Sequence, residues 1–243
     1  WGHMTTIAIF KWAMDPHDER VGVDGNVKWS ANKPVAGDDD HEVVKVALDI
    51  AGEGEIVGMT MAGGDTAFAA ARGAKRTIAI EGVDALAQPV ELAGALAAAV
   101  RAQEGVDAVV IGDSAWEPMV PSLLASMLGW PCVLAADGAR REGDALVVTR
   151  RFGAGTQDVQ VDSPAVIAVA ARREEESKPG MRATLAARKL PVEKIAGSAE
   201  GFAHMDSQGT HAPESAPARI FDGTNPEAAV EQLVAALKAE GVL

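Results

Sequence analysis

Three short segments of the sequence are the best candidates for binding chemistry, because each follows an apolar run. They are Lys11-Trp12-Ala13, Gly63-Gly64-Asp65-Thr66 and Gly112-Asp113-Ser114. Glycine lets a ligand approach the backbone closely, and free N–H groups at the start of a following helix attract negative charge. The pattern favours a nucleotide lying across the three segments. Tight strand-to-helix turns that bind nothing are the alternative, and the residue types support both interpretations equally.

Sequence motifs of self-sufficient active sites are missing. Neither Gly-x-x-x-x-Gly-Lys-Ser/Thr nor Gly-x-Gly-x-x-Gly occurs, and Ser114 and Ser122 lack the Gly-x-Ser-x-Gly elbow of hydrolases. Asp38-Asp39-Asp40 beside His41 resembles a metal-ligand set, but consecutive residues point in different directions. A solvated helix cap is the favoured interpretation. We therefore predict a binding protein with no catalytic and no metal-ligating residues.

Apolar, β-prone runs alternate with helical patterns along the first half of the chain. Strands are predicted at residues 6–10, 56–61, 76–80 and 107–111, and helices at residues 38–51, 67–72, 89–103 and 118–128. A small hairpin is predicted around Asp24-Gly25. Apolar strands separated by helices indicate a parallel sheet with right-handed crossovers. Ligands of such sheets bind outside the carboxyl ends of the strands, where the three candidate segments would meet.

The pattern changes after Trp130-Pro131. Residues 145–152 and 157–162 alternate about Gly153-Ala154-Gly155 and predict an antiparallel pair, and residues 165–170 predict a last buried strand. The predicted fold is α/β and Rossmann-like. It has a mostly parallel sheet flanked by helices, an antiparallel addition and a C-terminal arm.

The arm covers residues 172–243 and has little core of its own. We expect a short helix at residues 181–189, a strap through about residue 218, and a terminal helix that begins at Asn225-Pro226. That helix carries one apolar stripe, which consists of Ala229, Val230, Leu233, Val234 and Leu237. Burial against a partner or a second subunit is the favoured interpretation, and folding back on its own domain is the alternative. Residues 1–3 read as a tag remnant before a native start at Met4, and residues 4–171 as a nucleotide-binding-like domain.

Composition narrows the class of protein. The chain has 243 residues, 48% of them hydrophobic and only 4% aromatic, which favours a layered α/β protein. The net charge of −13 argues against nucleic-acid binding, which requires excess Lys and Arg. Cys132 is the single cysteine, as expected in a reducing compartment. No apolar run approaches the roughly 20 residues of a membrane span and no signal peptide is evident, so we expect a cytoplasmic protein without membrane insertion.

The succession of motifs resembles the beta subunit of electron-transfer flavoprotein, including the nitrogen-fixation-associated bacterial forms. Lys11 followed by Asp15 is similar to the family's Val-Lys-x-Val-x-Asp turn, and Gly37-Asp38-Asp39-Asp40 to its Asn-Pro-x-Asp stretch. Residues 163–169 resemble Leu-Pro-Ala-Val-Val-Thr-Val, and residues 187–192 resemble Ala-Lys-Lys-Lys-Pro-Ile. The resemblance extends over essentially the whole chain after Met4.

This resemblance implies a heterodimer with an alpha subunit, which in the family holds FAD between the two chains. Electrons would pass between a flavin dehydrogenase and an acceptor such as a quinone reductase. It also implies AMP, or a second FAD, bound by the beta subunit, and a docking loop that contacts the dehydrogenase through Met181. The residues that would bind the nucleotide are Ile9, Lys11, Asp39, Gly63, Asp65, Thr66, Gly112, Asp113, Ser114, Met119 and Val120.

The sequence departs from the family at the loop after residue 112, which is shorter than the family's Asp-Gly-Asp-Thr-x-x-Val/Thr-Gly. Pro118 has no N–H to donate, Met119 and Val120 replace polar contacts, and Glu117 brings a negative charge. Either a nucleotide is held by Ser114, Thr66 and backbone N–H groups, or the site is empty or filled otherwise. A stand-alone adenine-nucleotide sensor and a purely structural subunit without nucleotide are the alternative functions. The long arm favours the two-subunit interpretation over the sensor.

Overall fold

The computed structural model describes residues 4–29, 34–84, 86–113, 118–170, 178–198, 201, 205, 211, 214 and 217–243. The chain forms two compact units. The larger consists of Trp1–Arg20 with Val27–Gln208, and the smaller of Val21–Asn26 with Gly209–Leu243.

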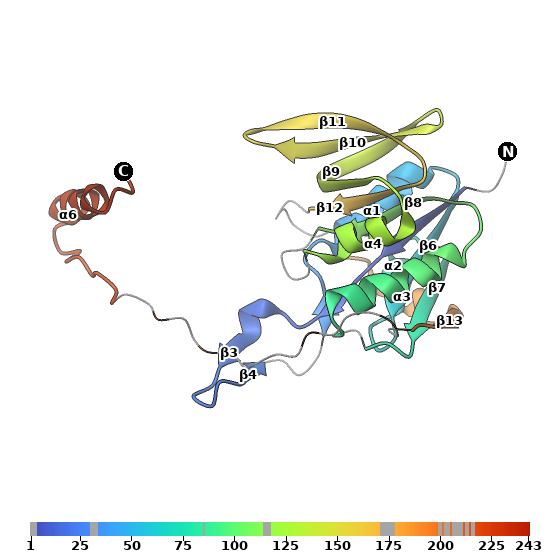
Figure 1. Cartoon of the computed structure of the whole chain (residues 1–243), viewed down its shortest axis with the longest axis horizontal. Helices are drawn as coiled ribbons and strands as arrows, with labels where there is room; N and C mark the ends of the chain where they lie inside the picture. Colours follow the sequence, from blue (N-terminus) through green and yellow to red (C-terminus); the bar gives the residue numbers. More distant parts are fainter. Residues whose placement is uncertain are drawn as a thin grey trace. The chain divides into compact units, whose positions relative to one another are not determined.

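A nine-stranded sheet forms the centre of the larger unit (Figure 1). Its order is β11-β10-β9-β12-β8-β1-β6-β7-β13. The strands are β1 (Thr5–Ile9), β6 (Glu55–Met61), β7 (Arg76–Glu81), β8 (Val106–Gly112), β9 (Cys132–Glu142), β10 (Ala145–Phe152), β11 (Gly155–Asp162), β12 (Ala165–Val169) and β13 (Val192–Ala196). In the spatial order of the sheet, every pair of neighbouring strands from β9 across to β13 is parallel. The pairs β9–β10 and β10–β11 are antiparallel. The predicted α/β fold with an antiparallel addition is confirmed.

Helices cover both faces of this sheet. The helices are α1 (Asp40–Ala51) and α2 (Ala67–Ala71) on one face, and α3 (Pro89–Arg101) and α4 (Val120–Leu128) on the other (Figure 1). Successive residues of a strand point to opposite faces, so Ile7 and Ile9 lie in the core under α3 and α4, while Ala8 and Phe10 lie in the core under α1. Burying a large apolar side chain of this kind contributes about 2 kcal/mol.

Two strands of this sheet were not predicted. The 11-residue strand β9 contains Gly138 and ends in Arg140, Arg141 and Glu142, and such residues give little sign of a strand. Pairing with β10 and β12 on its two sides holds it in place nevertheless. The edge strand β13 belongs to the stretch assigned to the arm, but it pairs in parallel with β7.

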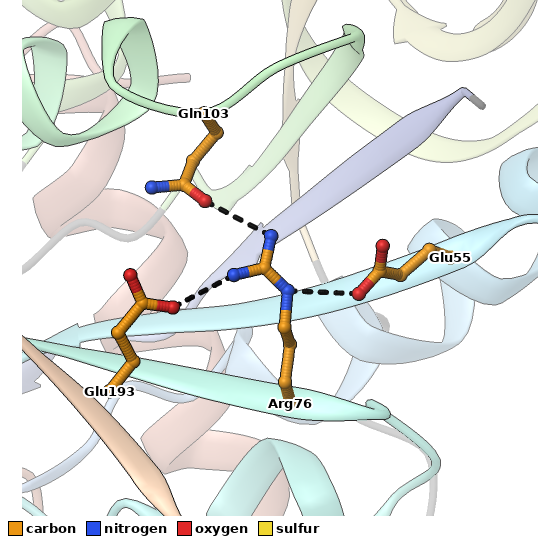
Figure 2. A network of polar contacts seen from close by, with 4 residues as sticks. All are labelled: Glu55, Arg76, Gln103 and Glu193. Carbon is orange, nitrogen blue, oxygen red and sulfur yellow. Dashed lines mark hydrogen bonds and ion pairs between the residues drawn. The ribbon is translucent and has the colours of Figure 1, made fainter. Parts of the chain in front are cut away.

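Arg76 ties β13 to the rest of the sheet at the amino ends of the strands. Figure 2 shows its guanidinium reaching three other residues from different segments. Nε donates to Glu55 at 2.9 Å, Nη1 to Glu193 of β13 at 2.9 Å, and Nη2 to Gln103, beyond α3, at 3.0 Å. Helix α5 (Met181–Ala187), which precedes β13, packs against α2. Residues 181–196 are therefore attached to the larger unit.

The boundary proposed between residues 171 and 172 lies outside the described residues, so the division into domain and arm stays a prediction. Most of the predicted strap at 196–218 also lies outside them. Met205 is described, and the Gln88 side chain binds its backbone twice, accepting from its N–H at 3.0 Å and donating to its carbonyl. These two hydrogen bonds attach Met205 of the strap next to the start of α3.

Two short pairs of strands precede α1. β2 (Trp12–Ala13) pairs with β5 (Val35–Ala36), and β3 (Glu19–Val21) with β4 (Val27–Trp29), which confirms the predicted hairpin. A single 3-10 turn, η1 (Pro16–Asp18), lies between β2 and β3.

The smaller unit contains the predicted terminal helix, α6 (Pro226–Ala239). The side chain of Asn225 caps it by accepting from the N–H of Ala228 at 3.3 Å, and Pro226 occupies the first turn. No residue of α6 is buried, and Val230 and Leu233 of its apolar stripe are 59% and 43% exposed. The predicted stripe is thus present, and the smaller unit by itself does not bury it.

Candidate functional site

The centre of the sheet contains the point at which the strand order reverses. The chain leaves β1 to form β6 and β7 on one side, then returns to form β8 on the other side of β1. Ile9 at the end of β1 is the register partner of Ile111 in β8. The segments at Lys11 and Gly112 therefore lie side by side at the carboxyl edge, where open α/β sheets bind ligands.

Lys11 crosses this crevice. Its side chain is buried, and its ammonium group donates to the carbonyl oxygen of Gly112 at 3.1 Å. A buried ammonium needs nearby partners to replace its lost hydration. The lysine is therefore used to join the ends of β1 and β8.

Asp40 lies beneath the same edge and is fully buried. Its Oδ2 accepts from the backbone N–H of Lys11 at 2.9 Å and of Gly37 at 2.8 Å, while Oδ1 is buried without a hydrogen-bond partner. Burial raises the pKa of Asp40 to about 7, although the Lys11 charge and the two N–H groups oppose the rise. The expectation of a solvated cap is wrong for Asp40, because the turn at Gly37 folds its carboxylate into the protein.

Gly112 is closely covered by Asp39 and Asp40. A Cβ at this position would lie 3.2 Å from Cβ of Asp39 and 3.4 Å from Oδ1 of Asp40. The predicted residues Ile9, Lys11, Asp39 and Gly112 thus lie close together at the ends of β1 and β8.

The turn after β6 is shaped by an aromatic side chain. A Cβ on Gly64 would lie 2.0 Å from Cδ1 and Nε1 of Trp12, so the indole covers the glycine directly. Trp12 also makes an edge contact with Phe68, with ring centroids 6.4 Å apart, and its Nε1 is buried without a partner. The predicted residue Asp65 accepts from the N–H of Ala67, the first residue of α2, at 3.1 Å. The glycine at position 64 therefore serves packing against Trp12.

Two other predicted residues of this turn follow β6. Gly63 has φ +101°, a conformation that L side chains rarely adopt. Thr66 is half-buried and precedes the first residue of α2.

Asp113, which follows β8, is hydrogen-bonded to residues of β12 and β9. The N–H of Asp113 donates to the carbonyl of Val169 at 2.7 Å, and its carboxylate accepts from the N–H of Ala135 in β9 at 2.7 Å. Ala135 has φ 56°, in the left-handed region that favours glycine, and this hydrogen bond holds its N–H there. Burial, together with the Asp113 charge, raises the pKa of the Cys132 thiol to about 11. The thiol is therefore protonated at neutral pH and is a poor nucleophile.

Three predicted residues remain: Ser114, Met119 and Val120. Ser114 is outside the described residues. Met119 is 56% exposed at the start of α4, and Val120 is fully buried in the core under α3 and α4.

A small pocket opens beside Lys11, on the side of α3 and α4. Its empty volume is about 280 Å³, open solvent included. Its walls include Ile9, Lys11, Trp12, Met61, Leu92 and Val120. Leu92 was not among the predicted site residues, and Trp12 was named only as a neighbour of Lys11. The walls are mainly apolar, so this space is suited to hydrophobic contact more than to a charged group.

The described part of the chain lacks two other kinds of feature. No group of three or more His, Cys, Asp and Glu side chains there gathers to hold a metal ion. No helix among those residues is both long and apolar enough to span a bilayer.

Comparison with known proteins decides the family. The family model described as "Electron transfer flavoprotein domain" matches residues 34–200. The chain belongs to the electron transfer flavoprotein family. It is 31% identical over 194 residues to the electron transfer flavoprotein subunit beta of Syntrophomonas wolfei, which covers 76% of this chain and 68% of that protein. It is also 31% identical over 111 residues to the probable subunit beta of Schizosaccharomyces pombe, across 44% of this chain and 43% of the yeast protein.

The likeness to beta subunits confirms the resemblance seen in the sequence motifs. The segment matched by the family model ends at residue 200, beyond α5 and β13. The part of the proposed arm that joins the sheet therefore belongs to the matched family domain.

Proposed function

We propose that this chain is the beta subunit of a heterodimeric electron-transfer flavoprotein of the cytoplasm. It pairs with an alpha subunit that holds most of the FAD, and the pair relays electrons between a flavin dehydrogenase and an acceptor. The bound flavin takes up and releases the electrons, and this chain completes its binding site and contacts the partner proteins. The likeness to beta subunits over 194 residues carries the proposal.

The exposed stripe of α6 supports pairing with another chain. Val230 and Leu233 lie on an amphipathic helix of which no residue is buried. An apolar stripe left in water is unfavourable, and burial against a partner stabilises it by about 25 cal/mol per Å². In the proposed heterodimer this stripe packs on the alpha subunit.

A second exposed apolar group supports docking on a dehydrogenase. Met181 begins α5 and is 80% exposed, and Leu185, one turn later on the same face, is 54% exposed. The unbranched thioether side chain of methionine adapts to irregular partner surfaces. Attachment of α5 to α2 and of the following strand to β7 presents Met181 on a folded element.

Co-expression with an alpha-like neighbour tests the pairing. We expect the two chains to co-elute at the mass of a heterodimer. Leu233→Lys in the stripe should reduce the yield of complex at least tenfold, whereas the matched control Glu231→Lys, on an exposed polar position of α6, should leave it unchanged. Separate elution of this chain from every alpha-like neighbour would contradict the proposal.

A further inference from the structure

We infer that Arg76 is a positioning residue for docking: through Glu193 it fixes β13 at the edge of the sheet, and β13 in turn fixes α5, which carries Met181. This rests on the proposed function, and it names a residue outside α5 on which docking of the dehydrogenase depends. Arg76 acts through other residues and is not itself part of the apolar face formed by Met181 and Leu185.

The segment 178–198, which contains α5 and β13, has little apolar packing to hold it in place. Ala187 is the one buried residue of this fully described stretch, and Ile195 is partly buried against the core under α3 and α4. Every residue of β1 and β12, by contrast, is buried. Because buried apolar area supplies most of the free energy that places an element, the position of this segment depends more than theirs on polar contacts.

Helix α5 and strand β13 are closely coupled to each other. Residues 188–191 join them, and the N–H groups of Lys189 and Leu190 donate to the carbonyls of Ala186 and Ala187, each at 3.1 Å. The last residue of the link is Pro191, whose ring restricts the backbone further. A displacement of β13 is therefore transmitted to α5 through a short, hydrogen-bonded link.

Arg76 ties β13 to elements beyond its neighbour in the sheet (Figure 2). β13 is an edge strand and pairs only with β7, over five register positions. Arg76 adds a bond to Glu193 at 2.9 Å while it also binds Glu55 of β6 and Gln103, which follows α3. The planar guanidinium holds such partners in a fixed geometry, so Glu193 is held relative to two elements of the interior as well as to β7.

The other ion pair of β13 restrains it less. The ammonium group of Lys194 lies 2.7 Å from Oε1 of Glu81, but the two side chains are 67% and 49% exposed. One contact between two flexible, exposed side chains fixes little. Among the described residues, the Arg76 network is therefore the main polar restraint on β13.

The network lies away from the candidate ligand crevice. Arg76 and Glu55 begin β7 and β6, whereas Lys11 and Gly112 lie at the carboxyl edge of the sheet. Loss of the Arg76 contacts should therefore alter the placement of α5 without altering the crevice.

Steady-state electron transfer from the cognate dehydrogenase to the purified heterodimer tests this inference, with the heterodimer concentration varied. Arg76→Gln removes the charge and the fork but keeps a long polar side chain. We expect the KM for the heterodimer to rise about fivefold, because α5 is then correctly placed about one fifth of the time, while kcat and the flavin absorbance spectrum stay unchanged. The matched control is Arg140→Gln, which removes an arginine with two carboxylate partners from β9 and should leave KM unchanged.

A second single variant and two double variants show whether Arg76 acts through Glu193 and α5. Glu193→Gln, which leaves Glu55 and Gln103 to hold Arg76, should raise KM to a similar extent. Adding Arg76→Gln to Glu193→Gln or to Met181→Ala should raise KM no further. An unchanged KM for Arg76→Gln, or additive effects in either background, would overturn the inference and leave the proposed function intact. An unchanged KM for Met181→Ala would instead count against the proposed docking itself.

Discussion

Replacing Asp40 by asparagine should change how the stability of this chain depends on pH. The carboxyl group is fully buried, and burial raises its pKa from the ordinary value of 3.8 to about 7. The charges that face it are Lys11, whose attraction opposes this rise, and Asp39, whose repulsion adds to it. The folded protein therefore binds this proton more tightly than the unfolded chain does.

The size and sign of the effect follow from this difference in pKa. The stabilisation is fully present below the unfolded pKa and is lost as the pH rises through about 7. The shift corresponds to about 4 kcal/mol in total, of which about 2.5 kcal/mol lies between pH 5 and pH 8. Asparagine keeps an oxygen for the N–H groups of Lys11 and Gly37 but carries no titrating proton. The free energy of unfolding of Asp40→Asn should therefore lack this fall.

Urea unfolding followed by tryptophan fluorescence provides the assay, since the chain has five tryptophans. The difference in unfolding free energy between wild type and Asp40→Asn is measured at pH 5 and at pH 8. Both proteins share all other titratable groups, so the contribution of those groups cancels in this difference. The control is Asp49→Asn, which removes an exposed carboxylate from the same helix. An equal pH dependence of wild type and Asp40→Asn would refute the assignment of a proton to Asp40.

Three further substitutions test other parts of the structure. Arg76→Ala removes partly exposed ion pairs, so it should cost only about 1 kcal/mol, but it should speed hydrogen exchange in β13 while leaving β1 unchanged. Gly64→Ala places a Cβ 2.0 Å from the Trp12 indole and should destabilise the fold by about 2 kcal/mol in urea unfolding. Met181→Ala should slow electron transfer from the cognate dehydrogenase several-fold while the absorbance spectrum stays unchanged, and unaltered transfer kinetics would argue against docking at this residue.

The sequence alone predicted the helices and strands whose signals lie within their own residues. Apolar runs such as Ile9 and its neighbours, alternating with helical patterns, indicated the parallel sheet and its two helical layers. Asn225-Pro226 marked the start of α6 because a cap and a first-turn proline are local signals. The edge strand β13 escaped prediction because its five residues become a strand only by pairing with β7, which is more than 100 residues earlier.

The site was harder to predict because its residues act on one another across the fold. The glycines at positions 64 and 112 suggested a ligand, yet the groups that approach them are Trp12 and the carboxylates of Asp39 and Asp40. Spacing along the chain does not reveal which side chain will fold over a glycine. Likewise, three consecutive aspartates suggested a solvated cap, and only the folded turn at residue 37 shows that Asp40 is buried.

The visible absorbance of this chain, purified alone and purified with its alpha-like neighbour, shows whether the two chains together hold the FAD. We expect no flavin band for the chain alone and a flavin band corresponding to one FAD per heterodimer for the pair. The band should bleach on reduction and return when an electron acceptor is added. A pair without flavin, or a chain that holds the flavin by itself, would rule out the proposed sharing of FAD between the two subunits.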